Sequence, residues 1–475
     1  MRKINSFKFL VNIVGFSAAS WISAVLSFVV LPISTRIFLP EDLAKINLFY
    51  SILTMVMSLA CLGLDQGYIR FYNERETETD KKKLLSACLM TGIIVLVIIM
   101  VCAIPISKYI RILIYGENQN MVIIPLFFCV LNMLSYRYIS LLYRMENNIL
   151  SYTIVAVVSS TMIKMSYLLA AFYRANYITA IYLMTLISII FFIILMVICR
   201  SQISIKTKIK SVLDKSILMF SLPLLPLGFM TQLNNYMPQF AIRSQGLFNE
   251  LGVFSSAVTL AAIITLLQSG LNIFWSPYIF KNYQLKEKEI KKMQKVITFV
   301  MISFAILILM FKDILVLILG PNYKNSIIYI PFLLLSPVCY TIAETTGIGI
   351  LIEKKSYLNV IAYGICILIN IILSFGFANI FGTIGASIAA GLTALILLLL
   401  RTIFGQKYYH SIQNNKIFIL QILVLCITST LNIVIIDKKV LSFLLNIALI
   451  FILFLVSFAN DLLKFVIAHI GWQKK

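Results

Sequence analysis

Apolar runs of about twenty residues alternate with short polar turns along most of the chain, which is the pattern of membrane-spanning helices. Residues 220–280 show the pattern well, because two such runs are joined there by the short turn G-L-F-N-E-L-G. The whole chain is predicted to form about 14 transmembrane helices, two of which begin near Tyr357 and Gly382. The predicted fold class is an all-α polytopic membrane protein.

The first helix of this hairpin is polar for a membrane span. Its prolines and amides are Pro223, Pro226, Pro238, Gln232, Asn234, Asn235 and Gln239. An unsatisfied polar group is costly in hydrocarbon, so the helix is expected to face protein or a water-filled cavity. Amides both donate and accept hydrogen bonds, which suits sugar hydroxyls in such a cavity. The alternative is that these amides hydrogen-bond to neighbouring helices.

The hairpin has a near copy earlier in the chain, at residues 31–65. Matching landmarks recur at nearly constant spacing: Arg36 and Arg243, Gly63 and Gly270, Lys108 and Lys312, Gly116 and Gly320, Glu146 and Glu353. Because six predicted helices separate the copies, both enter the membrane in the same orientation. This predicts two parallel-repeat six-helix lobes, residues 1–205 and 206–410, followed by two accessory transmembrane helices in residues 411–475.

The composition excludes an ordinary soluble domain. Of the 475 residues, 61% are hydrophobic and 12% are charged, and the mean hydropathy is +0.97. The net charge of +22 does not indicate a nucleic-acid partner, because most of the 40 Lys and Arg residues fall in loops on one side of the predicted membrane. Such loops face the cytoplasm, so both termini are predicted to be cytoplasmic in a bacterial inner membrane.

The chain offers no candidate catalytic, metal or cofactor site. Its eight cysteines occur singly in apolar runs, which indicates neither a disulfide framework nor a metal motif. No nucleotide-binding motif occurs, and no large loop is present to carry the catalytic residues of a membrane polymerase or ligase. The chain is therefore not expected to be an enzyme.

Lys164 is the sharpest candidate for a binding residue. It falls near the middle of the fifth predicted helix. A lysine at the centre of a membrane helix costs roughly 2.5–3.5 kcal/mol, so a partner or a wet cavity is expected around it. We predict that Lys164 lines a cavity and attracts an anion; the alternative is an ion pair or partial snorkelling without a substrate role.

Arg137 and Glu344 occupy equivalent depths in the two lobes, each the same distance before a landmark glutamate. One hypothesis is that they pair across the cleft in one state and separate in another. The other is that each finds a separate partner within its own lobe.

Further charged residues lie at the ends of the predicted helices. Arg36 and Arg243 end the first helix of each lobe, where they could gate or bind headgroups, or act as interfacial anchors. Asp65 and Arg70 close the second helix on the cytoplasmic side. There Arg70 could meet an incoming pyrophosphate, or the two could form a local bridge.

Short motifs along nearly the whole chain resemble the polysaccharide (Wzx-type) flippases of the multidrug/oligosaccharidyl-lipid/polysaccharide exporter superfamily. They are L-P-I-S-T-R-I-F-L-P-E-D-L, G-L-D-Q-G-Y-I-R-F-Y, S-L-P-L-L-P, L-G-V-F-S-S-A, W-S-P-Y, I-N-I-I-L and F-G-T-I-G-A-S. Two departures are Ala44, where the family usually has glycine, and Gln245-Gly246 in place of Leu-Gly. These departures alter the turns but not the resemblance.

The resemblance implies a flippase that moves an oligosaccharide repeat unit on undecaprenyl pyrophosphate from the cytoplasmic to the periplasmic leaflet. The product would be a surface polysaccharide such as O-antigen or capsule. The resemblance also implies membrane lipids, a polysaccharide polymerase and a chain-length regulator as partners. In this scheme Lys164, Arg137 and Arg70 attract the pyrophosphate, whereas Glu344, Arg36, Arg243 and Asp65 gate the path or couple it to ions. The alternative is a multidrug/cation antiporter of the same superfamily, with Glu344 as its titrating carboxylate.

Overall fold

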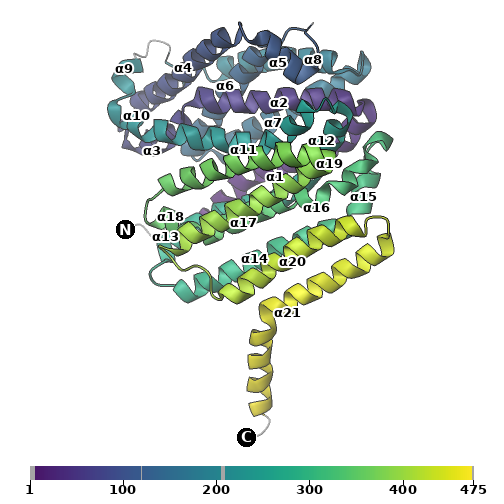
Figure 1. The fold of residues 1–475 in the computed structure, drawn as a ribbon. Coiled ribbons are helices and arrows are strands. Elements are labelled where there is room, and N and C mark those ends of the chain that lie inside the picture. Colours follow the sequence, from purple (N-terminus) through teal and green to yellow (C-terminus); the bar gives the residue numbers. More distant parts are fainter. Residues whose placement is uncertain (1–5, 119, 205–208, 473–475) are drawn as a thin grey trace. The chain divides into compact units, whose positions relative to one another are not determined.

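The computed structural model describes residues 6–118, 120–204 and 209–472, and within these ranges the chain is helical with no β-strand (Figure 1). Two compact units are formed. Unit 1 contains residues 1–259, 319–323 and 363–386, and unit 2 contains residues 260–318, 324–362 and 387–475. The predicted boundary between the lobes at residues 205–206 falls inside unit 1, and the division into lobes stays a prediction.

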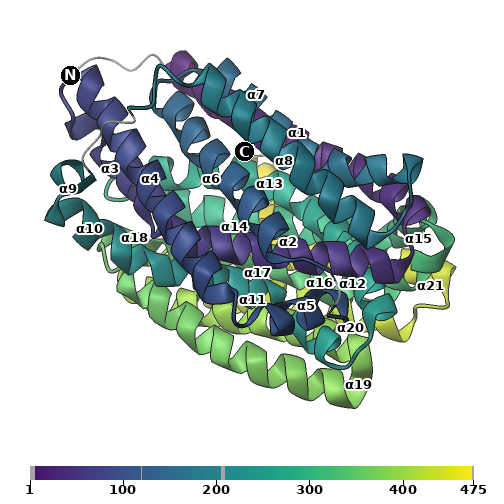
Figure 2. The same cartoon turned by 90° about the horizontal axis from the view of Figure 1, so that it is seen from above.

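Unit 1 consists mainly of the first twelve α-helices. They are α1 (Ser6–Ile37), α2 (Pro40–Cys61), α3 (Leu64–Phe71), α4 (Glu78–Ala103), α5 (Ser107–Tyr115), α6 (Ile123–Met145), α7 (Ile149–Leu168), α8 (Tyr177–Ile198), α9 (Ile209–Val212), α10 (Lys215–Ser221), α11 (Leu225–Ser244) and α12 (Phe248–Ala261). Three 3₁₀ turns join them: η1 (Tyr72–Glu74), η2 (Leu169–Phe172) and η3 (Leu222–Leu224). Helices α1 and α7 pack along each other (Figure 2).

Unit 2 holds the remaining helices, apart from the middle of α19. They are η4 (Ala262–Ile264), α13 (Thr265–Asn282), α14 (Glu287–Met310), α15 (Lys312–Leu317), η5 (Pro321–Ile328), α16 (Ile330–Leu333), α17 (Leu335–Thr346), α18 (Ile348–Ile352), α19 (Tyr357–Gln406), α20 (Asn415–Val434) and α21 (Lys439–Trp472). Residues 321–323 of η5 belong to unit 1. Helices α20 and α21 form an antiparallel pair (Figure 1).

The described chain has 11 helices long and apolar enough to cross a membrane, or 12 if the bent pair Pro321–Ile328 and Ile330–Thr346 is one span. This confirms the all-α polytopic class, whereas the count of about 14 is not confirmed. Two predicted helices are joined in the 50-residue α19, which is broken only at Gly382, where φ is 60°. Helix α1 contributes the shorter apolar stretch Trp21–Ile37.

Glycine allows the break between α2 and α3. Leu62 and Gly63 both have positive φ, 50° and 69°, so the chain leaves α2 through a left-handed turn and starts α3 at once. A Cβ at Gly63 would overlap the carbonyl oxygen of Ser221, and a Cβ at Gly67 would overlap the Ser221 hydroxyl. The two glycines therefore let α3 lie directly on α10, which fixes the direction in which the rest of α3 points.

Candidate functional site

Arg137 on α6 and Asp65 on α3 form an ion pair inside unit 1. The Arg137 Nη2 atom donates to Asp65 Oδ2 at 2.7 Å. Asp65 lies in the first turn of α3, where a carboxylate also meets the positive end of the helix. The Asp65 side chain is 13% exposed and that of Arg137 is 36% exposed. A guanidinium has five N–H donors, so the accessible part of Arg137 can still donate to a second anion.

Helices α3 and α6 also carry buried polar groups that lack hydrogen-bond partners. The hydroxyls of Tyr68 and Tyr138 and the Oδ1 atom of Asn132 are buried and have no hydrogen-bond partner among the described residues. Buried polar groups normally have partners. Helices α3 and α6 thus place unsatisfied polar atoms in the interior of the same unit that holds the Asp65–Arg137 pair.

Lys164 on α7 is half-buried, and its Nζ atom donates to the hydroxyl of Ser27 on α1. No carboxylate lies within 4.0 Å of this Nζ atom in the described parts of the chain. The ion pair that the sequence left open is therefore not formed there, and the lysine has only a neutral partner. A half-buried ammonium without a counter-ion gives this place in unit 1 a net positive charge.

The amides of α11 are divided between packing and exposure. Asn234 accepts two hydrogen bonds from Nδ2 of Asn370 on α19, at 2.8 Å to its backbone oxygen and 2.9 Å to its Oδ1 atom. Within the described ranges, Gln232 and Asn235 make no such bond, and Asn235 is exposed. Interhelical bonding therefore accounts for Asn234, whereas Gln232 and Asn235 stay candidates for a ligand.

The bond to the Asn234 backbone has a specific cause. Pro238 lies inside α11 and has no N–H, so it cannot donate to the carbonyl four residues earlier, which is that of Asn234. Asn370 supplies the missing donor, and Ser374 in turn donates to Asn370 Oδ1 at 2.7 Å. The proline is tolerated because a second helix satisfies the carbonyl that it frees.

Glu344 on α17 is paired within unit 2. Its Oε1 atom accepts from Arg401 Nη1 on α19 at 2.6 Å, with side chains 21% and 4% exposed. Arg137 and Glu344 thus have separate partners, each inside its own compact unit. Pairing of Arg137 with Glu344 in another state stays a prediction.

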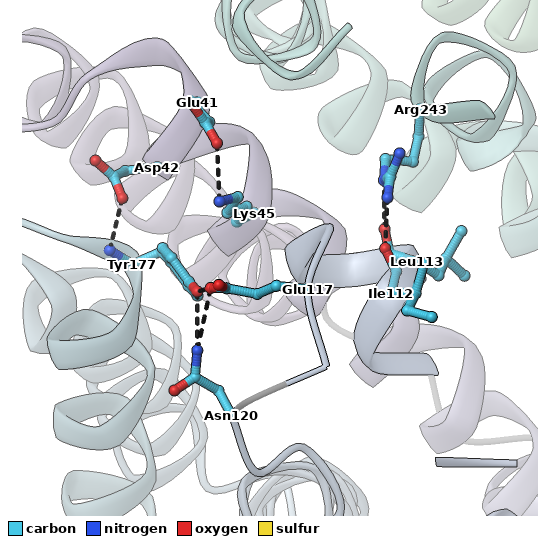
Figure 3. A network of polar contacts seen from close by, with 9 residues as sticks. All are labelled: Glu41, Asp42, Lys45, Ile112, Leu113, Glu117, Asn120, Tyr177 and Arg243. Atoms are coloured by element: carbon cyan, nitrogen blue, oxygen red, sulfur yellow. Dashed lines mark hydrogen bonds and ion pairs between the residues drawn. The ribbon is translucent and has the colours of Figure 1, made fainter. Parts of the chain in front are cut away.

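The remaining predicted residues lie near helix ends. Arg70 is paired with Glu74 at 2.6 Å on an exposed surface, so the local Asp65–Arg70 bridge is not formed. Arg36 is exposed at the end of α1. Arg243 ends α11 and donates through Nε to the carbonyl oxygen of Leu113 at 2.7 Å and through Nη2 to that of Ile112 (Figure 3).

Figure 3 also shows what the P-E-D motif does at the start of α2. Pro40 occupies the first helical turn, where its missing N–H is not needed. Glu41 pairs with Lys45 at 2.9 Å, and Asp42 accepts from the backbone N–H of Tyr177, the first residue of α8, at 3.0 Å. The motif therefore starts one helix and caps another.

Several partners could not be identified from the sequence, namely Ser27, Asn370, Ser374 and Arg401. In the sequence, Asn370 is only a polar residue in the apolar run I-N-I-I-L, and nothing there indicates that the Arg401 side chain is 4% exposed. Among the described residues, no group of three or more His, Cys, Asp or Glu could hold a metal ion.

Comparisons with known proteins agree with this architecture. Residues 9–282 match a family described as polysaccharide biosynthesis protein. The fold is similar to that of lipid II flippase MurJ in an inward closed conformation, with a TM-score of 0.66 and 16% identity over 94% of this chain and 99% of that one. It is also similar to an inward-facing multidrug resistance MATE family transporter, with a TM-score of 0.54 and 15% identity over 84% and 94%. No curated protein sequence matches.

Proposed function

The chain belongs to the family of polysaccharide biosynthesis proteins and is a multi-pass membrane transporter with a MATE-like fold, not an enzyme; from this premise we propose that it is a lipid-linked oligosaccharide flippase. Its substrate is an oligosaccharide repeat unit on undecaprenyl pyrophosphate. The protein moves this unit from the cytoplasmic to the periplasmic leaflet of a bacterial inner membrane, by alternating access of two repeat-related lobes, with both termini in the cytoplasm. The product feeds a surface polysaccharide such as O-antigen or capsule.

The observation that carries this proposal is the unneutralised charge of Lys164. Its ammonium is half-buried and bonded to the Ser27 hydroxyl, with no carboxylate nearby in the described chain. A positive charge without a counter-ion attracts an anionic headgroup, and a cationic drug would be repelled by it. Arg137 adds donors of the kind that bind phosphate oxygens.

A cation antiporter is less well supported. That function requires a carboxylate free to exchange ions, and Glu344, the candidate for this role, is engaged by Arg401 at 2.6 Å. In unit 1, the carboxylate of Asp65 is likewise engaged, by Arg137 at 2.7 Å. The flippase is therefore the function that these contacts favour, with a polymerase and a chain-length regulator as its partners in assembly.

The test uses the full chain in a bacterial host that lacks its own flippase and is scored by surface glycan. Lys164→Ala should reduce export roughly tenfold or more, because a charge-assisted bond contributes about 1.5–3 kcal/mol and each 1.4 kcal/mol is tenfold. Lys108→Ala is the matched control, since Lys108 is exposed near the start of α5. Both variants should reach the membrane in equal amounts. Normal export by Lys164→Ala would remove Lys164 from the binding site.

A further inference from the structure

We infer that the turn between α1 and α2 and the turn between α11 and α12 form a reciprocal latch, in which each turn docks on a landmark glycine of the other repeat. The latch comprises the first turn with the adjoining ends of α1 and α2, the second turn with the adjoining ends of α11 and α12, and the residues that receive them. Its members are Thr35, Phe38 and Pro40; Arg243, Phe248 and Gly252; and the receiving residues Gly116, Gly320 and Tyr323. All lie in unit 1. The inference rests on the proposed function in one respect, which is that opening the latch is a step of transport.

One half of the latch places the second turn on the end of α5. Arg243 donates to the last carbonyls of α5, those of Ile112 and Leu113, where a cation is also favoured by the helix dipole. The chain leaves α5 through Gly116, with φ of 81°. The positive φ favours glycine at this position, and a Cβ there would lie 2.8 Å from the ring of Phe248.

Two cations lie close to the ring of Phe248. The Arg243 guanidinium lies 4.2 Å from its centroid and Lys45 Nζ lies 5.1 Å from it. Lys45 is itself fixed by Glu41 at 2.9 Å and by the ring of Tyr177 at 4.4 Å. Cation–aromatic contacts stabilise a packed arrangement, and they are lost when the cation and the ring separate.

The other half places the first turn on the loop that follows α15. The backbone N–H of Gly320 donates to Thr35 Oγ1 at 3.0 Å, and the buried Tyr323 hydroxyl donates to the carbonyl oxygen of Phe38 at 3.0 Å. A Cβ at Gly320 would overlap the carbonyl oxygen of Thr35. Gly320 thus receives residues 35 and 36 as Gly116 receives residues 243 and 248.

The correspondence between the two halves is what makes this a latch between repeats. Gly116 and Gly320 are repeat mates, and so are Arg36 and Arg243, and each glycine meets the turn of the opposite repeat. When a residue of one repeat contacts a residue of the other, and the two equivalent residues make the reciprocal contact, the repeats have a two-fold arrangement. Between the halves, a Cβ at Gly252 would overlap the carbonyl oxygen of Pro40, so the turns also touch each other through backbone.

A contact made through glycine backbone is unusually sensitive to one added methyl group. Gly252→Ala and Gly320→Ala should each raise the separated population of the two turns by roughly tenfold, because closure would require the added carbon to overlap a carbonyl oxygen. The matched controls are Gly364→Ala and Gly376→Ala, which place a Cβ where no atom lies within 4 Å. These controls should leave the population unchanged.

The measurement is the distance distribution between spin labels at Leu39→Cys and Asn249→Cys, both exposed positions on the two turns, in the full-length protein. The background carries Cys102→Ser and Cys426→Ser, because the other native thiols are buried. The wild type should give one short distance. Arg243→Gln adds no atom to the interface, and its distance distribution should also contain a second, longer distance. This variant tests the latch if an alanine variant does not fold. Unchanged distributions in all folded variants would overturn the latch.

A transport measurement separates the latch from the proposed function. Joining the two introduced cysteines with a short bifunctional maleimide should abolish translocation of the lipid-linked oligosaccharide in proteoliposomes, and the unlinked protein should translocate it. Translocation by the linked protein would show that opening the latch is not a step of transport. An unlinked protein that does not translocate would instead contradict the flippase function and leave the spin-label result standing.

Discussion

Lys164 and Arg137 carry charge inside helical spans in two different ways. Arg137 is neutralised by Asp65 at 2.7 Å, whereas Lys164 has only the Ser27 hydroxyl. A paired charge and an unpaired charge respond differently to removal, because breaking a pair leaves a second charge uncompensated. Substitutions at the two positions therefore distinguish a structural role from a binding role.

The Asp65–Arg137 pair is expected to behave as a coupled unit. Asp65→Asn and Arg137→Gln should each lower the free energy of unfolding by about 1–3 kcal/mol, the usual cost of an unsatisfied group to which a charged bond was made. The double variant should lose less than the sum of the two. Thermal unfolding of the purified proteins measures both quantities, and strict additivity would show that the pair contributes nothing beyond its separate members.

Substitution of Lys164 should reduce translocation without reducing the stability of the protein. Lys164→Met replaces an ammonium whose burial at a helix centre costs roughly 2.5–3.5 kcal/mol, so the unfolding temperature should stay equal or rise while translocation falls. Lys164→Met and wild type are compared in the same detergent and in the same vesicles. A clear loss of stability in Lys164→Met would make the lysine a structural tie between α7 and α1.

The sequence was sufficient to locate these charges but not their partners. Lys164, Arg137 and Glu344 stand out because each interrupts an apolar run, which is a property of the local sequence. Asp65 and Arg401 became partners through the packing of α3 on α6 and of α17 on α19. Such neighbours are distant in the chain, so a single sequence carries no direct signal for them.

Helix α11 illustrates how one element depends on another. Pro238 frees the Asn234 carbonyl, and the amide of Asn370 on α19 satisfies it. The polar, broken character of α11 is evident from its prolines and amides, and it predicts that the helix faces protein or a water-filled cavity. That the neighbouring amide is on α19 required the structure.

This dependence predicts a strong coupling. Asn370→Ala should lower the free energy of unfolding by about 1–3 kcal/mol, because the half-buried carbonyl of Asn234 is left without a donor. In a Pro238→Ala background the same change should cost clearly less, since an alanine has the backbone N–H that can donate to the Asn234 carbonyl within the helix. Thermal unfolding of the four proteins provides the cycle. Equal costs in both backgrounds would mean that the proline is not the reason for the bond.

The accessory helices α20 and α21 are tied to unit 2 by a buried lysine. Lys312 on α15 is fully buried, and its Nζ atom donates to Asn432 Oδ1 at 2.8 Å and to Asn432 O and Ser442 Oγ at 3.2 Å. Asn432 and Ser442 belong to α20 and α21. From the sequence, Lys312 was only a landmark of the repeat in a loop on the non-cytoplasmic side.

Removing this lysine should loosen the hairpin that it holds. Lys312→Met leaves Asn432 and Ser442 without their charged donor, so α20 and α21 should become more susceptible to limited proteolysis and the unfolding temperature should fall by a few degrees. The control is Lys108→Met at the repeat-related position, which is exposed and should change neither measurement. Equal susceptibility of the two variants would contradict the assignment.

At the scale of the whole molecule, hydropathy predicted the fold class and the short motifs indicated the family. The number of spans was less secure, because a hydropathy window cannot tell a helix that bends from two helices joined by a short loop. At Gly382 the chain bends through one residue with φ of 60°, and at η5 two short helices meet at 59°. Glycine or proline permits both of these local backbone conformations. A hydropathy average over about nineteen residues does not detect them.

The predicted orientation in the membrane can be tested with thiol labelling. Asn249 lies at the start of α12 and Lys288 near the start of α14, and both are exposed. A membrane-impermeant maleimide applied from the periplasmic side should label Asn249→Cys and not Lys288→Cys, because the basic loop at Lys288 is predicted to be cytoplasmic. The reverse pattern would invert the topology.

The bond between Asn370 and the backbone of Asn234 also constrains how this family can drift. A lineage that replaces Pro238 first regains a backbone N–H that can donate to the Asn234 carbonyl, and it can then change Asn370 freely. A lineage that loses Asn370 first must pass through a form in which the Asn234 carbonyl has no hydrogen-bond donor. Evolution across this pair is therefore expected to proceed in one order: descendants without the asparagine should already have lost the proline.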